Sequence, residues 1–403
     1  MKEKVVLAFS GGLDTSVIVP WLRENYDYDV IAVCINVGQD KELTGLEDRA
    51  KAMGVAKLYI EDVKEEFAKD YIFPMLKSGA IYESRYYLGT SIARPLIAKV
   101  LVEIAIKENA VAICHGCTGK GNDQVRFELA IKSLAPHIQI IAPWRIWDIT
   151  SRDQEIEYLQ QRNLPVPMKK EESYSRDLNL WHISHEGLDL ENPENAPNYD
   201  TLLKLGTYPE KAPENAETIT ITFEKGEPTH LNDQALSPAK LIEELNKLGG
   251  KHGIGIEDIV ENRVVGMKSR GVYETPGGKI LYYAHEMIEH LTLDRETYQY
   301  KQQVALEYSR LIYDGKWFTP LRDALAAFVD STQRFVSGKV TLKLYKGNII
   351  SQGAASKYSL YSEDLASFTT GDLYNHHDAD GFITLFGLPS KVRALMHQKN
   401  EGK

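Results

Sequence analysis

The first 165 residues alternate short apolar runs with longer stretches of helical character. Continuous apolar runs that are separated by helices predict a parallel sheet covered on both faces. Ligands of such sheets bind beyond the carboxyl ends of the strands, so the loops starting at Ser10, Asn36 and His115 are candidate site loops. The predicted strands are Lys4 to Phe9, Tyr28 to Val37, Lys57 to Ile60, Ala110 to Cys114 and Ile138 to Ile141, with a helix over Asp14 to Glu24.

The pattern changes after Asn163. Segments 164–177 and 191–216 are rich in Pro, Asn and Glu, which is typical of loops and of a domain boundary. Beyond them the sequence predicts strands at 219–231 and 340–350, helices at 237–250 and about 284–314, and a tail from Tyr361 with a weakly helical end. We therefore predict three regions: an α/β domain (1–165), an α+β domain (166–360) and a C-terminal arm (361–403).

Composition narrows the possible functions. The chain has 403 residues, of which 43% are hydrophobic and 26% charged, as in ordinary soluble proteins. A net charge of −10 favours small-molecule substrates over nucleic acid, which is usually bound by basic surfaces. No apolar run approaches the roughly 20 residues of a membrane span, and no export signal is recognisable. With only three cysteines, these features predict a cytoplasmic protein with no membrane partner.

The strongest motif is AFSGGLDTS at positions 8–16, between a predicted strand and a predicted helix. Gly11 and Gly12 let backbone amides approach phosphate oxygens, and the helix start adds partial positive charge. The motif lacks the Lys of a Walker loop and the spacing of a dinucleotide loop. It resembles the pyrophosphate loop of the N-type ATP pyrophosphatases. The alternative is an ordinary strand–helix turn in which Ser and Asp act as caps.

A second loop, HGCTGKGNDQVRFE at 115–128, also joins a predicted strand to a predicted helix. Asn122 and Arg126 are four residues apart and share a helix face. The Asp123 carboxylate suits an ammonium group, and the Arg126 guanidinium suits a carboxylate. Together they indicate a site for a zwitterionic amino acid. Helix capping with a surface Arg is the alternative.

Five segments, in order along the chain, resemble argininosuccinate synthase. They are SGGLDTS, RYYLGTSIARP (85–95), HGCTGKGNDQVRFEL, IAPWR (141–145) and IVENRVVGMKSRGVYETPGG (259–278). This resemblance implies that ATP, L-citrulline and L-aspartate give argininosuccinate, AMP and diphosphate through a citrullyl-AMP intermediate, in arginine biosynthesis. It also implies Mg²⁺ bound with ATP, a homotetramer, and no protein nucleophile. By the same resemblance, region 1–165 would bind the nucleotide, region 166–360 would be the synthetase and multimerisation domain, and region 361–403 would be an oligomerisation arm.

The resemblance further implies three sets of binding residues. The ATP site would use Ala8, Phe9, Ser10, Gly11, Gly12, Leu13, Asp14, Thr15, Ser16, Ile35 and Gly116. The citrulline site would use Tyr86, Ser91, Asn122, Arg126, Ser175, Ser184, Glu261 and Tyr273. The aspartate site would use Thr118, Asn122 and Asp123.

Cys114 and Cys117 form a CxxC spacing, which in other proteins marks a metal, redox or sulfur-handling pair. With only Cys34 remaining, a four-cysteine zinc site cannot form, so we interpret them as small buried hydrophobes. His376 and His377 are interpreted as a solvated pair, and no protein-held metal site is expected.

Two other functions fit part of the sequence. A tRNA-modifying ATP pyrophosphatase would share the loop at 8–16 but predicts a basic RNA-binding appendage. A non-catalytic adenine-nucleotide-binding module would need only the first 165 residues and leaves the block at 259–278 unexplained.

Overall fold

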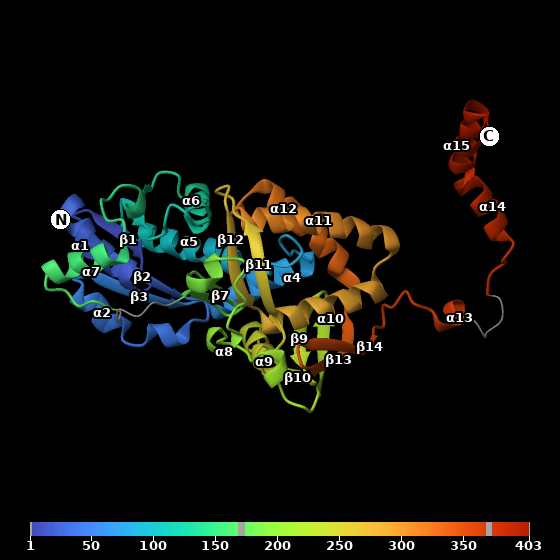
Figure 1. Cartoon of the computed structure of the whole chain (residues 1–403), viewed down its shortest axis with the longest axis horizontal. Helices are drawn as coiled ribbons and strands as arrows, with labels where there is room; N and C mark the ends of the chain where they lie inside the picture. Colours follow the sequence, from blue (N-terminus) through green and yellow to red (C-terminus); the bar gives the residue numbers. More distant parts are fainter. Residues whose placement is uncertain (1, 168–173, 368–372, 403) are drawn as a thin grey trace. The chain divides into compact units, whose positions relative to one another are not determined.

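The computed structural model describes residues 2–167, 174–367 and 373–402 (Figure 1). The predicted loop at 164–177 therefore lies partly outside the described residues. The chain forms two compact units, residues 1–358 and 359–403. Each unit is described by itself.

The N-terminal strands form the predicted parallel sheet. Its order is β3-β2-β1-β4-β5, and every neighbouring pair is parallel. The strand order reverses between β1 and β4, because β2 and β3 lie on one side of β1 and β4 and β5 on the other. The strands are β1 (Lys4–Ala8), β2 (Asp29–Asn36), β3 (Lys57–Asp62), β4 (Ala112–Cys114) and β5 (Gln139–Ile141).

Helices cover both faces of this sheet, as predicted. Alternate strand side chains point to opposite faces, so Val6 packs in one cluster and Val5 and Leu7 in another. The cluster of Val6 includes α5 (Gly89–Glu108) and α6 (Asp123–Leu134). The opposite cluster includes α1 (Leu13–Tyr26), α2 (Leu46–Ala52) and α7 (Arg152–Gln161).

A second sheet, entirely antiparallel, has the order β10-β9-β8-β13-β14. The segments predicted as single strands, 219–231 and 340–350, each form a hairpin of two strands. The chain turns near Gly226 in the first hairpin and near Gly347 in the second, and both glycines adopt positive φ. The hairpins are β8 (Glu217–Glu224) with β9 (Glu227–Leu231), and β13 (Gly338–Tyr345) with β14 (Asn348–Ala355); β10 is Gln234–Ala235. Helices α9 (Pro238–Lys251) and α10 (Pro276–Thr292) pack against this sheet (Figure 1).

A third, four-stranded antiparallel sheet was not predicted by the hydrophobic pattern. Its order is β11-β12-β7-β6. The strands are β6 (Ser175–Leu178), β7 (Ile183–Glu186), β11 (Ile256–Asn262) and β12 (Lys268–Glu274). It carries the block at 259–278, so that block belongs to the folded core of the second region.

The prediction of one helix over 284–314 is wrong. The chain forms α10, which ends at Thr292, and α11 (Arg295–Tyr313). Leu293 is extended, and the Asp294 side chain accepts a hydrogen bond from the Thr297 amide at 2.9 Å. This cap starts a new helix, because it satisfies an amide that would otherwise lack a partner. The remaining helices of this unit are α3 (Lys64–Glu66) and α4 (Phe73–Ser78), joined by a π-helical turn at Phe67–Ile72, then α8 (Tyr199–Leu202) and α12 (Pro320–Thr332).

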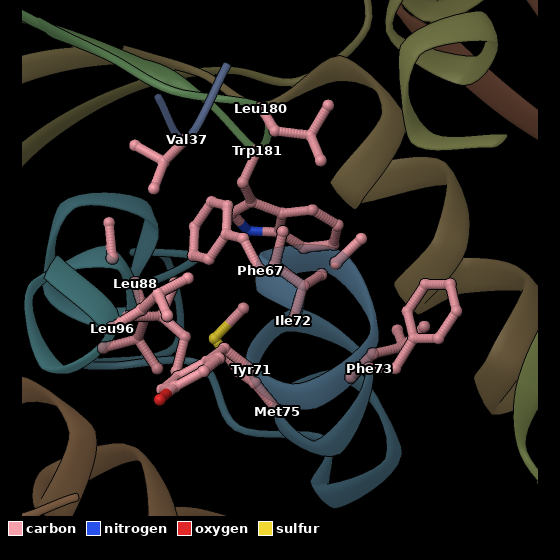
Figure 2. Close-up of a cluster of buried hydrophobic side chains, with 14 of the residues drawn as sticks. Val37, Phe67, Tyr71, Ile72, Phe73, Met75, Leu88, Leu96, Leu180 and Trp181 are labelled. Atoms are coloured by element: carbon pink, nitrogen blue, oxygen red, sulfur yellow. The ribbon is translucent and has the colours of Figure 1, made fainter. Parts of the chain in front are cut away.

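Residues 2–358 share a hydrophobic core that joins the N-terminal region to the second region. Trp181 is fully buried among side chains from segments far apart in sequence, including Val37, Phe67 and Leu88 (Figure 2). Its indole Nε1 donates a hydrogen bond to the Tyr87 carbonyl at 2.9 Å. Burying an indole of this size, with its polar atom satisfied, fixes the position of the loop before β7 against α5.

The unit at 359–403 contains α13 (Glu363–Ala366), α14 (Asp378–Phe386) and α15 (Leu388–Glu401). The predicted helical end is present and continues the helical region that begins at Asp378. Helices α14 and α15 expose large apolar side chains, among them Phe382, Leu385 and Phe386. In the part of the chain that the structure describes, no helix combines the length and apolar character needed to cross a membrane.

The close approach of β2 to the loop before β7 generates a stability prediction. Gly38 has φ +122°, and a Cβ there would lie 2.3 Å from the Leu180 amide nitrogen. That amide donates to the Val37 carbonyl at 2.7 Å. We expect Gly38→Ala to lower the free energy of unfolding by about 3 kcal/mol, since it adds backbone strain and a steric clash.

Urea unfolding measures this effect. Gly119→Ala is the matched control, because a Cβ at Gly119 meets nothing within 4 Å. Equal loss of stability in the two variants would contradict this role for Gly38.

Candidate active site

The reversal of strand order opens a cavity of about 480 Å³ at the carboxyl edge of the parallel sheet. The ends of β1 and β2 and the loop after β4 contribute to its wall, as do α5, α6 and all four strands of the four-stranded sheet. A crevice at such a reversal is where open parallel sheets bind ligands. The cavity therefore joins the two regions that the sequence motifs occupy.

The loop after β1 forms one wall of the cavity. Ala8, Phe9, Ser10, Gly12, Asp14 and Thr15 line it. The Ser10 hydroxyl accepts a hydrogen bond from the Gly12 amide at 3.3 Å and lies 3.2 Å from the Thr15 hydroxyl. These contacts hold the loop at the N-terminus of α1, where unpaired amides and partial positive charge favour an anion.

The loop after β4 lies beside the first loop. Gly116 and Thr118 line the cavity, as does Ile35 at the end of β2. A Cβ at Gly116 would lie 3.2 Å from Ile18 of α1, so the two loops are in contact distance. Backbone from three neighbouring strands therefore surrounds one end of the cavity.

A network of buried charge lies at the start of α6. Arg94 of α5 places its Nη2 atom 2.8 Å from Asp123 Oδ2 and 2.9 Å from Asp177 Oδ2. On the other side, Arg126 Nη1 donates to Asp123 Oδ1 at 2.9 Å. Burial alone would raise the pKa of the Asp123 carboxyl, but the two guanidinium groups lower this pKa to about 2. Asp123 is therefore an anion at neutral pH.

The four-stranded sheet presents one face to the cavity. Asp177, Ser184 and Tyr273 are directly opposite one another on β6, β7 and β12, so they share that face. Ser175 lies two residues before Asp177 on the same face and also lines the cavity. The row combines a carboxylate with hydroxyl groups, as the recognition of a polar ligand requires.

Two tyrosines hold the carboxylate of Glu261 on β11. The Tyr273 hydroxyl donates to Oε1, and the Tyr313 hydroxyl donates to Oε2. Glu261 is 5% exposed and lines the cavity together with Tyr86, Asn122 and Arg126. Burial raises the pKa of the Tyr86 hydroxyl to about 12, so this group is a neutral hydrogen-bonding partner.

Most residues that the sequence assigned to a site line this one cavity, but five do not. Ser184 is 3% exposed on its strand, and Ser91 is fully buried in α5. Gly11, Leu13 and Ser16 belong to the loop and the first turn of α1 but are absent from the cavity wall.

The structure adds residues that the sequence analysis did not single out. Arg94 and Arg263 lie inside two of the recognised segments and could have been selected from their charge alone. Asp177 and Glu186 line the cavity from short strands that the hydrophobic pattern did not predict. Burial raises the pKa of the Glu186 carboxyl despite its ion pair with Arg263.

The cysteines of the CxxC pair have different surroundings. Cys114 is fully buried in β4, whereas Cys117 is partly exposed and lines the cavity. Burial raises the pKa of both thiols, which keeps them protonated and unreactive at neutral pH. Within the described residues, no group of three or more His, Cys, Asp or Glu side chains could hold a metal ion.

Behind the phosphate loop lies a buried acid. Glu155 of α7 is fully buried and interacts with the Asp14 side chain of the loop. Burial, followed by the negative charge of Asp14, raises the pKa of Glu155 to about 9. The Glu155 side chain is therefore a neutral carboxylic acid at physiological pH. It lies behind the loop and does not line the cavity.

Comparison with known proteins covers the whole chain. Residues 4–165 match the family model of the arginosuccinate synthase N-terminal HUP domain, and residues 174–393 match that of the arginosuccinate synthase C-terminal domain. The argininosuccinate synthase of Lachnoclostridium phytofermentans is 65% identical over 398 residues, which is 98% of each chain. The argininosuccinate synthase of Acetivibrio thermocellus is 64% identical over 402 residues, covering 100% of this chain and 99% of that relative.

The raised pKa of Glu155 generates a prediction about stability and pH. An unfolded glutamate ionises near pH 4.5, whereas the folded group stays protonated up to about pH 9. The stability that the neutral acid supports is therefore complete below pH 4.5 and declines as the pH rises toward 9. Glu155→Gln removes this dependence, so the variant should gain stability over the parent with rising pH, by roughly 3 kcal/mol between pH 5.5 and pH 8.

Urea unfolding of both proteins at pH 5.5 and pH 8 measures this difference. A stability difference that stays constant between the two pH values would show that Glu155 is not buried as the neutral acid.

Proposed function

The chain belongs to the argininosuccinate synthase family, and on that premise we propose how its cavity divides among ATP, citrulline and aspartate. The enzyme is an ATP-dependent ligase of arginine biosynthesis. It joins L-citrulline to L-aspartate and releases AMP and diphosphate, through a citrullyl-AMP intermediate. Because the match extends over both regions of the chain, the tRNA-modifying and non-catalytic alternatives are not retained.

The ATP site is formed by residues 8–16, Ile35 and Gly116. The loop after β1 binds the β and γ phosphates, which leave as diphosphate. Its amides and the hydroxyls of Ser10 and Thr15 supply the donors, and the N-terminus of α1 adds positive potential. No lysine lines the cavity among the described residues, so the backbone carries much of the phosphate binding.

Citrulline binds in the polar cluster opposite that loop. Arg126 binds its carboxylate, and the Glu261 carboxyl group receives its ammonium group. The remaining residues of this site are Tyr86, Ser91, Asn122, Ser175, Ser184 and Tyr273; Ser91 and Ser184, which do not line the cavity, support the others from behind. The observation that carries this proposal is that Arg126 and Glu261 line the same cavity as the phosphate loop, although they come from different regions of the chain.

Aspartate binds between these two sites, at Thr118, Asn122 and Asp123. The Asp123 carboxylate is ionised and half-buried, so it can receive an ammonium group or hold an amine in position for attack. Arg94 keeps this carboxylate in place from the side of α5.

The chemistry then needs positioning and charge stabilisation rather than a protein nucleophile. The ureido oxygen of citrulline attacks the α phosphorus, and the bond to diphosphate breaks. The amine of aspartate next attacks the ureido carbon, AMP leaves with the ureido oxygen, and the amine loses a proton. Bringing three substrates together in one cavity accounts for much of the acceleration such reactions require.

Magnesium accompanies ATP in this proposal. Nucleotide-bound Mg²⁺ uses one or two carboxylates together with phosphate oxygens and water, so it needs no complete protein ligand set. Asp14 fits, since its carboxylate lines the cavity within the phosphate loop. When bound, the ion neutralises charge on the departing diphosphate.

Three further assignments complete the proposal. The nucleotide-binding region spans 1–165, the synthetase region 166–360 and the arm 361–403. The apolar side chains that α14 and α15 expose support oligomerisation through the arm, in a homotetramer. The small-molecule substrates and the three free cysteines support a cytoplasmic location.

The division between the two amino-acid sites can be tested at Asp123. We expect Asp123→Asn to lower kcat/KM for aspartate by roughly 30-fold, because it removes a charge-assisted hydrogen bond to the amine. Citrulline-dependent exchange of labelled diphosphate into ATP should stay within about threefold of the parent, with the exposed Asp233→Asn as control. Loss of exchange with unchanged aspartate dependence would reverse the assignment of the two sites.

The role of Asp14 predicts a change in magnesium dependence. Asp14→Asn should raise the Mg²⁺ concentration for half-maximal diphosphate release by about 10-fold at saturating ATP, since one anionic ligand is lost. Asp233→Asn is the control, because its exposed carboxyl group pairs with Lys339 and does not line the cavity. Identical magnesium dependence in all three proteins would remove Asp14 from the proposed ion site.

A further inference from the structure

Tyr313 is the last residue of α11 and is 1% exposed. No sequence motif singled it out, and it does not itself line the cavity. It nevertheless makes hydrogen bonds with three residues of the proposed citrulline site, through both its side chain and its backbone. Those residues come from α6 and β11, which are far from α11 in sequence.

The Tyr313 hydroxyl connects two of these residues. It accepts a hydrogen bond from Asn122 Nδ2 at 2.9 Å and donates its own proton to Glu261 Oε2. The Asn122 Oδ1 atom meanwhile accepts from the Val264 amide at 2.9 Å. Both ends of the Asn122 amide are thus fixed, and the Glu261 carboxylate is held from the side opposite Tyr273.

The Tyr313 carbonyl orients the third residue. It accepts a hydrogen bond from Arg126 Nε at 2.8 Å, and the guanidinium lies 4.8 Å from the centre of the Tyr313 ring. Because Nε is committed to Tyr313 and one Nη1 proton to Asp123, the remaining Nη protons can bind a substrate carboxylate. Gly315 permits this approach, since a Cβ there would lie 2.6 Å from the Arg126 Cα atom.

The ring of Tyr313 is itself held rigidly. It stacks on Tyr82 with 3.6 Å between ring centres and an angle of 5°, and it meets the Tyr86 ring edge-on at 6.0 Å. Burial raises the pKa of the Tyr313 hydroxyl, which therefore keeps the proton that it donates to Glu261. A rigid ring with a fixed donor is suited to positioning other side chains.

We propose that Tyr313 is a positioning residue for citrulline: it fixes Asn122, Arg126 and Glu261 in the geometry that binds the amino-acid end of this substrate. This inference rests on the proposed citrulline site and deepens it. It assigns a substrate-specific role to the end of α11, a helix without any substrate-binding residue of its own.

The test is Tyr313→Phe, which removes the hydroxyl while keeping the stacked ring and the backbone contact to Arg126. The expected result is a rise of about 10-fold in the citrulline KM and in the citrulline Kd measured by calorimetry. The KM values for ATP and aspartate should stay within about twofold. Tyr308→Phe is the matched control on the same helix, because the buried Tyr308 ring packs against Trp317 instead.

A double-mutant cycle separates positioning from a general effect on the fold. If Tyr313 acts through Glu261, the Y313F/E261Q variant should bind citrulline about as weakly as E261Q alone, since the two losses are coupled. The inference would be overturned if the loss of citrulline affinity in the double variant equalled the product of the losses in the two single variants. An equal rise in all three KM values, or an unchanged citrulline affinity in Y313F, would also overturn it. If E261Q itself leaves citrulline affinity unchanged, the proposed citrulline site fails, which is a different outcome from failure of Tyr313 alone.

Discussion

The reversal of strand order between β1 and β4 is the constraint from which the active site follows. Strands on either side of this point connect in opposite directions, so no helix crosses the carboxyl edge there and the loops after β1 and β4 meet around an open crevice. The four-stranded antiparallel sheet borders the same cavity. Its polar face supplies carboxylate and hydroxyl groups for amino-acid substrates. The hydrogen bond from the Leu180 amide to the Val37 carbonyl and the buried Trp181 connect the two sheets, so their relative position is set by the core.

Buried charge imposes the second requirement. A carboxylate in a cavity wall is unstable unless cations or hydrogen-bond donors satisfy it. Asp123 is held by Arg94 and Arg126, while Glu261 is held by two tyrosine hydroxyls. These partners come from α5, α6, β12 and α11, so each ionised group in the cavity links several parts of the fold. The same contacts that stabilise the charges also fix their directions, which is how stability and substrate positioning arise from one network.

A feature of the fold or site could be predicted from the sequence when the residues that form it lie close together along the chain. The loop at 8–16 could be predicted because a strand, two glycines and a helix start are adjacent in sequence. The break at Leu293 was missed although Asp294, three residues before Thr297, is a recognisable N-cap. Strands β6 and β7 gave no signal, since SRDL and ISHE are short and lack apolar alternation. Tyr313 could not have been found from local pattern, because its role depends on contact with residues such as Arg126, 187 positions away.

The most direct test of the account is a crystal structure of the protein with citrulline, Mg²⁺ and a non-hydrolysable ATP analogue. Citrulline is expected to lie in the cavity between the parallel and four-stranded sheets, with its carboxylate on Arg126 and its ammonium group near Glu261. Its ureido oxygen should point toward the α phosphorus of a nucleotide whose β and γ phosphates rest on the loop after β1. Citrulline bound elsewhere on the protein, or with its ureido group turned away from the α phosphorus, would contradict the account.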